Sequence, residues 1–165
     1  MARAILVCGP SGAGKTTYAR SVARDLGAVR FSIDPWMQTL YAADMTSLDF
    51  SWILERVNRC HEQIWDTCAQ ILKLDGNVVL DLGFSTKAQR AWFADKLSAL
   101  GLSAEVHYLD APRGIRKDRI VKRNHDKDPA VYAFEVTEGM FDFMEPRFEP
   151  PNPDELRHGH RLNTG

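Results

Sequence analysis

The sequence predicts an α/β fold in which helices cover a parallel β-sheet. Short apolar runs alternate along the chain with longer segments of helical periodicity, as expected for consecutive strand–helix units. The 165 residues are enough for one domain with a substantial core, and a composition of 44% hydrophobic and 26% charged residues is ordinary for a globular protein. The sequence contains no internal repeat or low-complexity linker. We therefore expect residues 1–165 to form a single domain.

The predicted strands are short apolar runs bounded by glycine or polar residues. They lie at Arg3–Cys8, Val29–Ile33, Asn77–Leu82, Ser103–Leu109 and, near the C-terminus, His160–Thr164. The clearest helix spans Leu48–Leu74, because its apolar residues keep to one face and Gly76 suits a C-terminal stop. Further helices are predicted at Lys15–Leu26, Lys87–Leu100, Pro112–Lys127 and Val136–Met144.

Composition also bears on the class of protein. The net charge is −1, which gives the whole molecule no general attraction to nucleic acid or to an anionic membrane. The apolar run near the N-terminus is too short for a secretory signal or a membrane span, and no later segment qualifies. The cysteines, Cys8, Cys60 and Cys68, have neither paired nor metal-ligand spacing. We expect a cytoplasmic protein with reduced thiols and no membrane partner.

The segment GPSGAGKT, from Gly9 to Thr16, matches the pattern G-x-x-x-x-G-K-[ST] and lies between a predicted strand and a predicted helix. Small residues let backbone N–H groups surround a polyphosphate, and a helix N-terminus adds partial positive charge. We expect Lys15 to reach the terminal phosphates and the Thr16 hydroxyl to ligate Mg²⁺. Because no N-K-x-D motif for guanine is present, ATP is the expected nucleotide. The predicted nucleotide-binding residues are Gly9, Pro10, Ser11, Gly12, Ala13, Gly14, Lys15, Thr16 and Thr17.

Two aspartates follow predicted strands, at the edge where ligands bind in an open parallel sheet. Asp81 comes after three apolar residues, which predicts a Walker B carboxylate that orients Mg²⁺ directly or through water. We expect Asp34 to lie nearer the acceptor and to accept a proton from a hydroxyl during phosphoryl transfer. The alternative for each is structural, a strand-end turn or a helix N-cap, and Pro35 also fits a helix start after Asp34.

Basic residues gather in one predicted helix. The segment 113–127 holds seven Lys or Arg residues against Asp118 and Asp126. At helical spacing Arg116, Arg119, Arg123 and Lys127 fall within an arc of about 80°. Arginine binds phosphate oxygens in a fork and stabilises charge on a transferring group, which predicts a phosphate-clamping lid with Arg119 and Arg123 at its centre. A solvated helix face is the alternative.

Four segments occur in the order seen in small P-loop kinases: GPSGAGKTTYA, FSIDPWM, VVLDLGFSTKAQR and YLDAPRGIRKDRIVKRN. Over nearly its whole length the chain resembles the AAA-type ATP-binding proteins grouped with zeta toxins, chloramphenicol phosphotransferases, gluconate kinases and the kinase domain of polynucleotide kinase. The resemblance implies a three-layer α/β/α P-loop nucleoside triphosphate hydrolase fold with a five-stranded parallel sheet of order 2-3-1-4-5. It also implies that Asp34 is the base or an acceptor-binding residue, and that Arg119 and Arg123 belong to a lid at about residues 112–130. The chain is too short for the helical lid domain of AAA+ machines, so we expect no ring and no mechanical work.

Two further residues are candidates for the acceptor site. Arg90, in GFSTKAQR, lies where the resemblance makes an acceptor contact plausible, and a surface arginine that opens a helix is the open alternative. Trp36 follows Asp34 by two residues and is a candidate to stack on an acceptor, against a place in the core or at its rim.

These patterns favour a Mg·ATP-dependent phosphotransferase that acts on a hydroxyl group of a small molecule. Lys15, Asp34, Arg119 and Arg123 are the expected catalytic residues, with Thr16 and Asp81 at the metal. A polynucleotide 5′-hydroxyl kinase is one alternative, although the only basic patch lies in the presumed lid. The other is an ATP-binding switch or partner-binding ATPase without an acceptor. The sequence leaves the acceptor open, as well as the choice between monomer and homodimer.

Overall fold

The computed structural model of the protein describes residues 1–129, 131–132 and 134–165. The strands are β1 (Ala4–Cys8), β2 (Val29–Ser32), β3 (Val78–Asp81), β4 (Ala104–Asp110) and β5 (His160–Asn163). The α-helices are α1 (Lys15–Leu26), α2 (Ile33–Tyr41), α3 (Phe50–Lys73), α4 (Lys87–Ala99), α5 (Arg113–Asp126) and α6 (Glu138–Met144). Short 3₁₀ helices follow α2 (η1, Ala42–Asp44) and α6 (η2, Glu145–Arg147).

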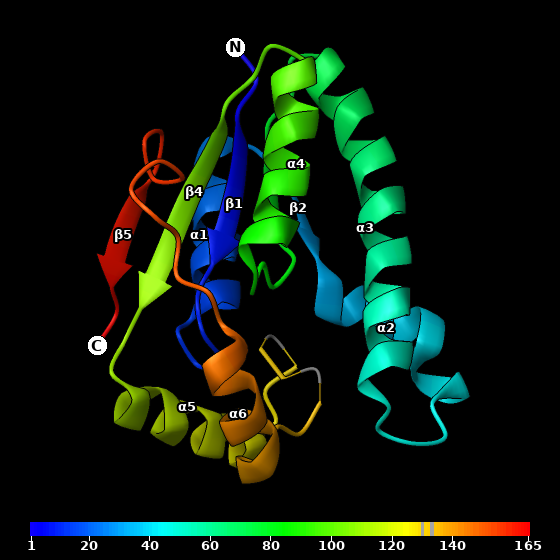
Figure 1. Cartoon of the computed structure of the whole chain (residues 1–165), viewed down its shortest axis with the longest axis vertical. Helices are drawn as coiled ribbons and strands as arrows, with labels where there is room; N and C mark the ends of the chain where they lie inside the picture. The colour runs from blue at the N-terminus through cyan, green and yellow to red at the C-terminus, as the bar shows by residue number, and fades with distance from the viewer. Residues whose placement is uncertain (130, 133) are drawn as a thin grey trace.

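The five strands form one sheet in the order β2-β3-β1-β4-β5, and all neighbouring strands pair in parallel. Figure 1 shows α1 on one face of the sheet and α3 and α4 on the other, while α5 and α6 lie beyond the carboxyl ends of β1 and β4. The predicted three-layer P-loop fold and its strand order are therefore confirmed. Since β1 is central, the loop that follows it opens in the middle of the carboxyl edge, next to the ends of β3 and β4.

The core is divided by the sheet, because successive side chains of a strand point to opposite faces. Leu6 of β1 packs in a cluster with Ile64 of α3 and Phe93 of α4. Its neighbour Ile5 packs in a second cluster with Ala19 of α1. The strands in the middle of the sheet are thus apolar on both faces, as expected for a parallel sheet covered on both sides.

Local sequence signals mark the helix ends. Gly27 ends α1 in the left-handed conformation, with φ of 59°. Asp49 caps α3 by accepting hydrogen bonds from the backbone N–H groups of Ser51 and Trp52 at 3.0 and 3.4 Å. At the start of α4, Thr86 and Gln89 form a reciprocal capping box.

The end of β2 differs from the sequence expectation. The predicted strand Val29–Ile33 ends at Ser32, and Ile33 begins α2, a helix that the sequence analysis raised only as the alternative for Asp34. Pro35 lies in the first turn of α2, where its fixed φ is compatible with a helix and its missing N–H costs nothing. The strand therefore passes directly into a helix and leaves Asp34 in the first helical turn.

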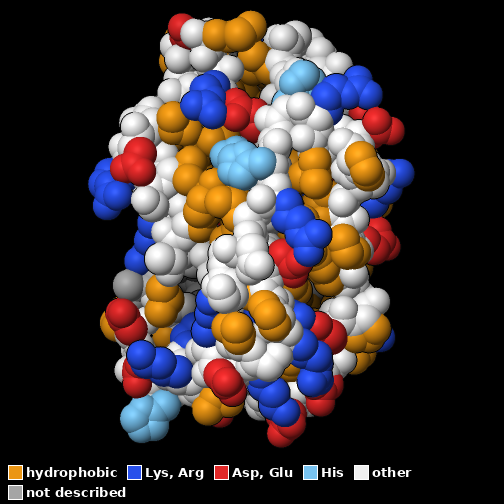
Figure 2. Space-filling view, turned by 90° about the vertical axis from the view of Figure 1, so that its left-hand side faces the viewer, with side chains coloured by type: hydrophobic (Ala, Val, Ile, Leu, Met, Phe, Trp, Pro, Cys, Tyr) orange, Lys and Arg blue, Asp and Glu red, His pale blue; other side chains and the backbone are white. Residues whose placement is uncertain are grey.

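The surface on the β5 side of the molecule carries charges of both signs. Figure 2 looks at the side of the molecule that carries β5, and basic and acidic side chains are interspersed over this face. Within the described ranges, none of the helices combines the length and the apolar character that crossing a bilayer requires.

Candidate nucleotide and phosphoryl-transfer site

The loop between β1 and α1 has the backbone shape of a phosphate cradle. Gly12 and Gly14 adopt φ of 80° and 92°, a region that residues with a Cβ rarely enter. A Cβ on Gly12 would overlap the backbone oxygen of Arg116, whereas the space beside Gly14 is open. The glycines thus allow α5 to approach the loop on one side and leave room for a ligand at the N-terminus of α1.

The Lys15 side chain folds back onto the backbone of this loop. Its Nζ donates hydrogen bonds to the backbone oxygens of Gly9 at 2.9 Å and Pro10 at 3.1 Å. Burial lowers the pKa of Lys15, and the carboxylates of Asp81 and Asp34 oppose this shift. A half-buried ammonium group held by neutral carbonyls gains from an anionic partner, so Lys15 suits a polyphosphate.

Thr16 and Asp81 meet at the carboxyl edge of the sheet. The Thr16 hydroxyl donates to Asp81 Oδ2 at 3.2 Å, although the two residues are 65 positions apart in the chain. A hydroxyl beside a carboxylate offers the oxygen ligands that Mg²⁺ prefers. The described part of the chain holds no cluster of three or more His, Cys, Asp or Glu residues fit for a metal, so Mg²⁺ here would complete its shell with phosphate oxygens and water.

Asp34 lies at the same edge, next to β3. Ser32 occupies the N-cap of α2, so the alternative that Asp34 is the helix cap is wrong. The Asp34 side chain reaches solvent, but the protein around it raises its pKa by desolvation, and the Asp81 carboxylate raises it further. Lys15 and Arg123 act in the opposite direction. The structure thus brings Lys15, Asp34, Asp81 and Arg123 into one electrostatic neighbourhood.

Arg123 contributes a buried donor to this neighbourhood. Its Nε is shielded from solvent and has no hydrogen-bond partner among the residues that the structure describes. Burial lowers the pKa of Arg123, while Asp34 and Tyr132 raise it. Because an unsatisfied buried donor is costly, a site beside it is suited to a ligand with acceptor oxygens, such as a phosphoryl group.

The other arginines of α5 have different surroundings. Arg116 is 5% exposed and donates to the backbone oxygens of Ala111 at 2.8 Å and Ser11 at 3.2 Å, and it also pairs with Glu145. It therefore anchors α5 to the phosphate loop rather than facing solvent as a lid residue.

Arg119 donates to the Gly12 backbone oxygen at 3.3 Å and to the Thr164 hydroxyl at 3.1 Å. Its role over the transferring group stays a prediction. The lid was expected at about residues 112–130, and Ala130 lies outside the described residues.

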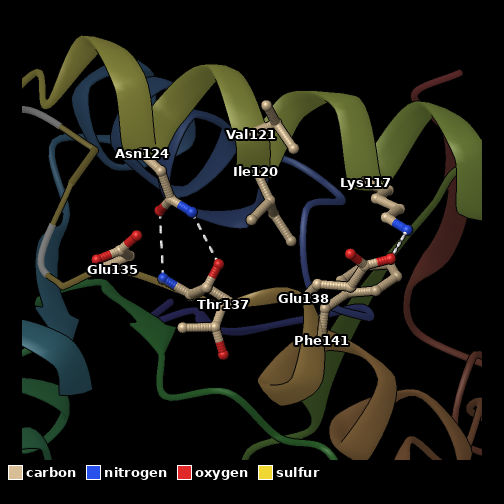
Figure 3. Close-up of a pocket in the computed structure, with 9 residues that line it drawn as sticks. Lys117, Ile120, Val121, Asn124, Glu135, Thr137, Glu138 and Phe141 are labelled. Atoms are coloured by element: carbon tan, nitrogen blue, oxygen red, sulfur yellow. Dashed lines mark hydrogen bonds and ion pairs between the residues drawn. The ribbon is translucent and has the colours of Figure 1, made fainter.

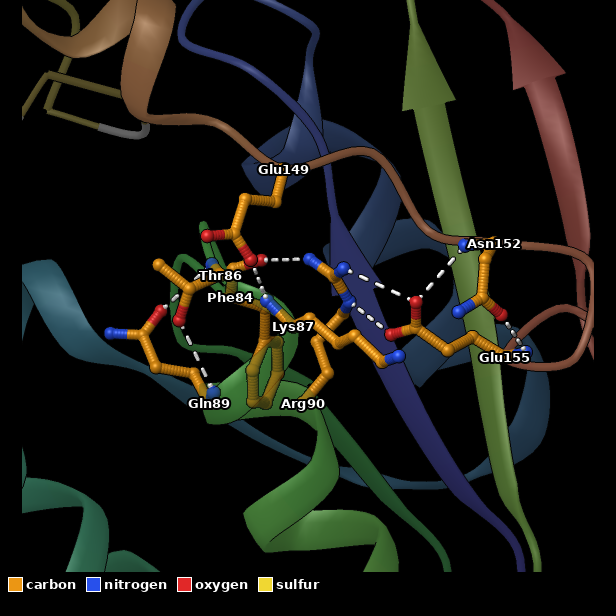
Figure 4. A network of polar contacts seen from close by, with 8 residues as sticks. All are labelled: Phe84, Thr86, Lys87, Gln89, Arg90, Glu149, Asn152 and Glu155. Carbon is orange, nitrogen blue, oxygen red and sulfur yellow. Dashed lines mark hydrogen bonds and ion pairs between the residues drawn. The ribbon is translucent and has the colours of Figure 1, made fainter.

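Arg90 is neither a surface arginine nor open to an acceptor. It is 1% exposed, and its Nε donates to Glu155 Oε1 at 2.6 Å while Nη1 donates to the Phe84 backbone oxygen at 2.9 Å. Figure 4 shows this contact joining the start of α4 to the C-terminal segment, which runs over the α3/α4 face of the sheet before β5. Arg90 is a structural residue because helix α4 begins beneath that segment, which the sequence pattern around Arg90 does not reveal.

A separate pocket of about 260 Å³ lies between α5 and residues 135–141 (Figure 3). Several of its polar groups pair with one another: Lys117 with Glu138, and Asn124 with the Val136 backbone at 2.8 and 3.2 Å. None of the predicted site residues lines it, so we do not assign it to the phosphoryl-transfer site.

Trp36 is half-buried against the core cluster that contains Leu6 and Phe93, and its contact with an acceptor stays a prediction.

Some residues of the site were missed by sequence reasoning. Arg30 and Ser32 both donate to Asp81 at 3.3 Å, and alternation along β2 is the signal that would have grouped them. Thr164 donates to the Ala13 backbone oxygen at 2.9 Å. Its position 151 residues from Ala13 carries no local signal.

Comparisons with known proteins agree with this geometry. A family model described as an AAA domain matches residues 5–151 of the chain. Among curated proteins, none matches the sequence.

Solved structures resemble the chain over nearly its whole length. An unliganded sugar kinase from Janibacter sp. HTCC2649 has a TM-score of 0.67 and 20% identity, with 99% of this chain and 86% of that chain covered. Kti12 from Chaetomium thermophilum, solved with ADP-AlF3, has a TM-score of 0.73 and 17% identity, with coverage of 98% and 89%. The APS kinase of Mycobacterium tuberculosis, solved with AMPPNP and APS, has a TM-score of 0.63 and 20% identity, with coverage of 99% and 88%. Identities this low establish the fold alone.

Proposed function

The chain belongs to the AAA domain family, and on this premise we propose that it is a Mg·ATP-dependent phosphotransferase that transfers the γ-phosphate of ATP to a hydroxyl group of a small molecule. The observation that carries the proposal is the position of Asp34. A carboxylate open to solvent stands within electrostatic reach of Lys15, Asp81 and Arg123, beside the phosphate loop. A protein that only binds ATP has no need of a base at this point.

Each residue has a distinct task in this proposal. Lys15 and the backbone N–H groups of the loop bind the β- and γ-phosphates. When bound between Thr16 and Asp81, Mg²⁺ would neutralise phosphate charge. Arg123 donates its Nε to the transferring group, where negative charge spreads over the equatorial oxygens. Asp34 accepts the hydroxyl proton as the acceptor oxygen bonds to phosphorus and the bond to ADP breaks.

The first experiment measures ATP consumption with a panel of sugars, nucleosides, antibiotics and 5′-hydroxyl oligonucleotides. With the best acceptor, Lys15→Ala is expected to abolish transfer, because the loop loses its charge on the phosphates. Asp34→Asn is expected to lower kcat by at least about 10²-fold while ATP affinity stays within about twofold, since a general base contributes 10²–10⁴-fold. Asp25→Asn, on the exposed end of α1, is the matched control and should leave kcat unchanged.

The outcomes separate the alternatives. Unchanged turnover in Asp34→Asn would remove the base from the proposal. Tight ATP binding without any acceptor, together with an ATP-dependent protein partner, would favour the switch. Transfer to oligonucleotides that collapses when salt is raised modestly would favour a polynucleotide kinase, because phosphate contacts release counterions.

A further inference from the structure

Three donors converge on a single oxygen of Asp81. The Oδ2 atom accepts hydrogen bonds from the hydroxyls of Thr16 at 3.2 Å and Ser32 at 3.3 Å. It also accepts one from Nη1 of Arg30 at 3.3 Å. The side chains of Asp81 and Arg30 are 6% and 20% exposed, so this ion pair is largely shielded from water. Arg30 has no task in the transfer described above.

Arg30 reaches Asp81 from the face of the sheet that α1 covers. The register pairs Arg30 with Val79 and Ser32 with Asp81, so these residues share one face of the two strands. Val79 packs in the cluster that contains Ala19 of α1. Because Asp81 pairs with Ser32, two residues further along β2, the Arg30 side chain runs along this edge strand toward its carboxyl end.

We propose that Arg30 is a positioning residue that supplies the positive charge at Asp81 until Mg²⁺ arrives with its nucleotide, and that it weakens binding of the metal alone. The inference rests on the proposed Mg·ATP site at Thr16 and Asp81. A buried carboxylate without a counter-charge is strongly unfavourable. Lys15 also acts on Asp81 through space, but Arg30 is the cation in direct contact with it, at 3.3 Å. A divalent cation beside Thr16 would lie near the guanidinium and be repelled by it.

The charge of Arg30 bears on the order in which the metal and the nucleotide bind. The nucleotide phosphates carry enough negative charge to offset the repulsion between Arg30 and the metal. Metal is therefore expected to enter as the metal–nucleotide complex, rather than ahead of the nucleotide. Ser32, a neutral donor to the same oxygen, helps to orient the carboxylate but does not compete with a cation.

The test is a titration with Mn²⁺, in which free Mn²⁺ is followed by electron paramagnetic resonance. Arg30→Gln is expected to bind Mn²⁺ about tenfold more tightly than the wild type without nucleotide, because a nearby positive charge has been removed. The gain should be smaller in the presence of AMPPNP. Arg30→Lys keeps the charge and should stay within about twofold of wild type, and so should Ser32→Ala, the control for loss of a neutral donor.

Thermal unfolding supplies a second readout. In EDTA, Arg30→Gln should melt at a lower temperature than the wild type, and Mn²⁺ should raise its Tm by more than it raises the wild-type Tm. Arg30→Met, which keeps the apolar stem of the side chain, should behave in the same way. If both variants are unfolded and Mn²⁺ does not restore them, Arg30 is simply part of the fold and the proposal is overturned.

The binding data distinguish the remaining outcomes. Equal or weaker Mn²⁺ affinity in Arg30→Gln, with wild-type binding intact, would overturn the role of Arg30 and leave the proposed function standing. No binding of Mn²⁺ by the wild type, even with AMPPNP, would overturn both, because Arg30 would then have no metal to oppose.

Discussion

Asp34 illustrates how neighbours decide what a residue can do. An isolated aspartate is ionised at neutral pH and is a poor proton acceptor, but desolvation and Asp81 raise the pKa of Asp34 and make it a better base. Lys15 and Arg123 lower the pKa of Asp34 and so limit that rise. The pKa of Asp34 is therefore set by all four charged residues together rather than by Asp34 alone.

The pH dependence of phosphoryl transfer should report the raised pKa of Asp34. A base with a raised pKa stays protonated to a higher pH, so kcat should rise with pH along an acid limb that lies above the ordinary aspartate value of 3.8. Arg123→Gln removes a positive charge that lowers the pKa of Asp34, and it should shift the limb to higher pH besides lowering kcat.

The profile is measured as kcat against pH between about 4 and 9 with saturating substrates. Lys122→Gln serves as the control on the same helix, since Lys122 is exposed, and its limb should coincide with that of the wild type. An identical acid limb in Arg123→Gln would show that Arg123 does not act on Asp34.

Among the secondary-structure elements, α4 shows how strongly a short local pattern determines a helix start. Thr86 accepts a hydrogen bond from the Gln89 backbone N–H at 3.2 Å, and Gln89 Oε1 accepts one from the Thr86 backbone N–H at 3.3 Å. Both donors would otherwise lack intrahelical partners. The helix predicted from Lys87 begins at that residue because Thr86 caps it.

Loss of this cap should cost stability without affecting the site directly. Thr86→Ala is expected to lower the free energy of unfolding by about 1 kcal/mol, because an N-terminal donor loses its acceptor. Thr86→Ser keeps the acceptor oxygen and should recover most of that loss. Denaturant unfolding followed by circular dichroism measures both, and equal stability of wild type and Thr86→Ala would contradict the capping role.

Considered as a whole, the molecule is held together across long sequence distances by its C-terminal segment. Glu155, in the segment that precedes β5, accepts a hydrogen bond from Arg90 Nε at 2.6 Å. Thr164, just after β5, donates to the Ala13 backbone oxygen at 2.9 Å. The end of the chain therefore contacts both the helix that follows β3 and the phosphate loop.

The Arg90–Glu155 pair should carry much of that stabilisation. Arg90→Met is expected to lower the free energy of unfolding by about 3–5 kcal/mol, because Glu155 loses its buried partner. The double variant Arg90→Met/Glu155→Leu should recover a large part of the loss, since neither charge is then left unpaired.

Arg157→Met is the matched control for this pair. Arg157 pairs with Asp154 on the surface, with side chains 70% and 88% exposed, and its replacement should change stability by less than about 0.5 kcal/mol. Similar losses for Arg90→Met and Arg157→Met in urea unfolding would contradict a special role for the buried pair.

The sequence by itself determined the strand order through its resemblance, most helix and strand positions, and the residues of the phosphate loop. These features follow from local periodicity, from caps, and from a glycine-rich pattern whose geometry is specific to one short segment. The helix α2 was raised only as an alternative, because its nine residues are too few to show a clear period and Pro35 favours several local structures.

Only the tertiary structure decided which charged side chains meet. Arg30 pairs with Asp81 across 51 positions and Arg90 with Glu155 across 65, whereas Arg116, on the same predicted face as Arg123, is buried against Ser11 and Glu145. Helical spacing fixes the direction in which a side chain leaves the helix axis, but it does not fix which residues of other elements that side chain meets. Electrostatic roles depend on distance and burial, and both arise when strands distant in sequence become neighbours in the sheet.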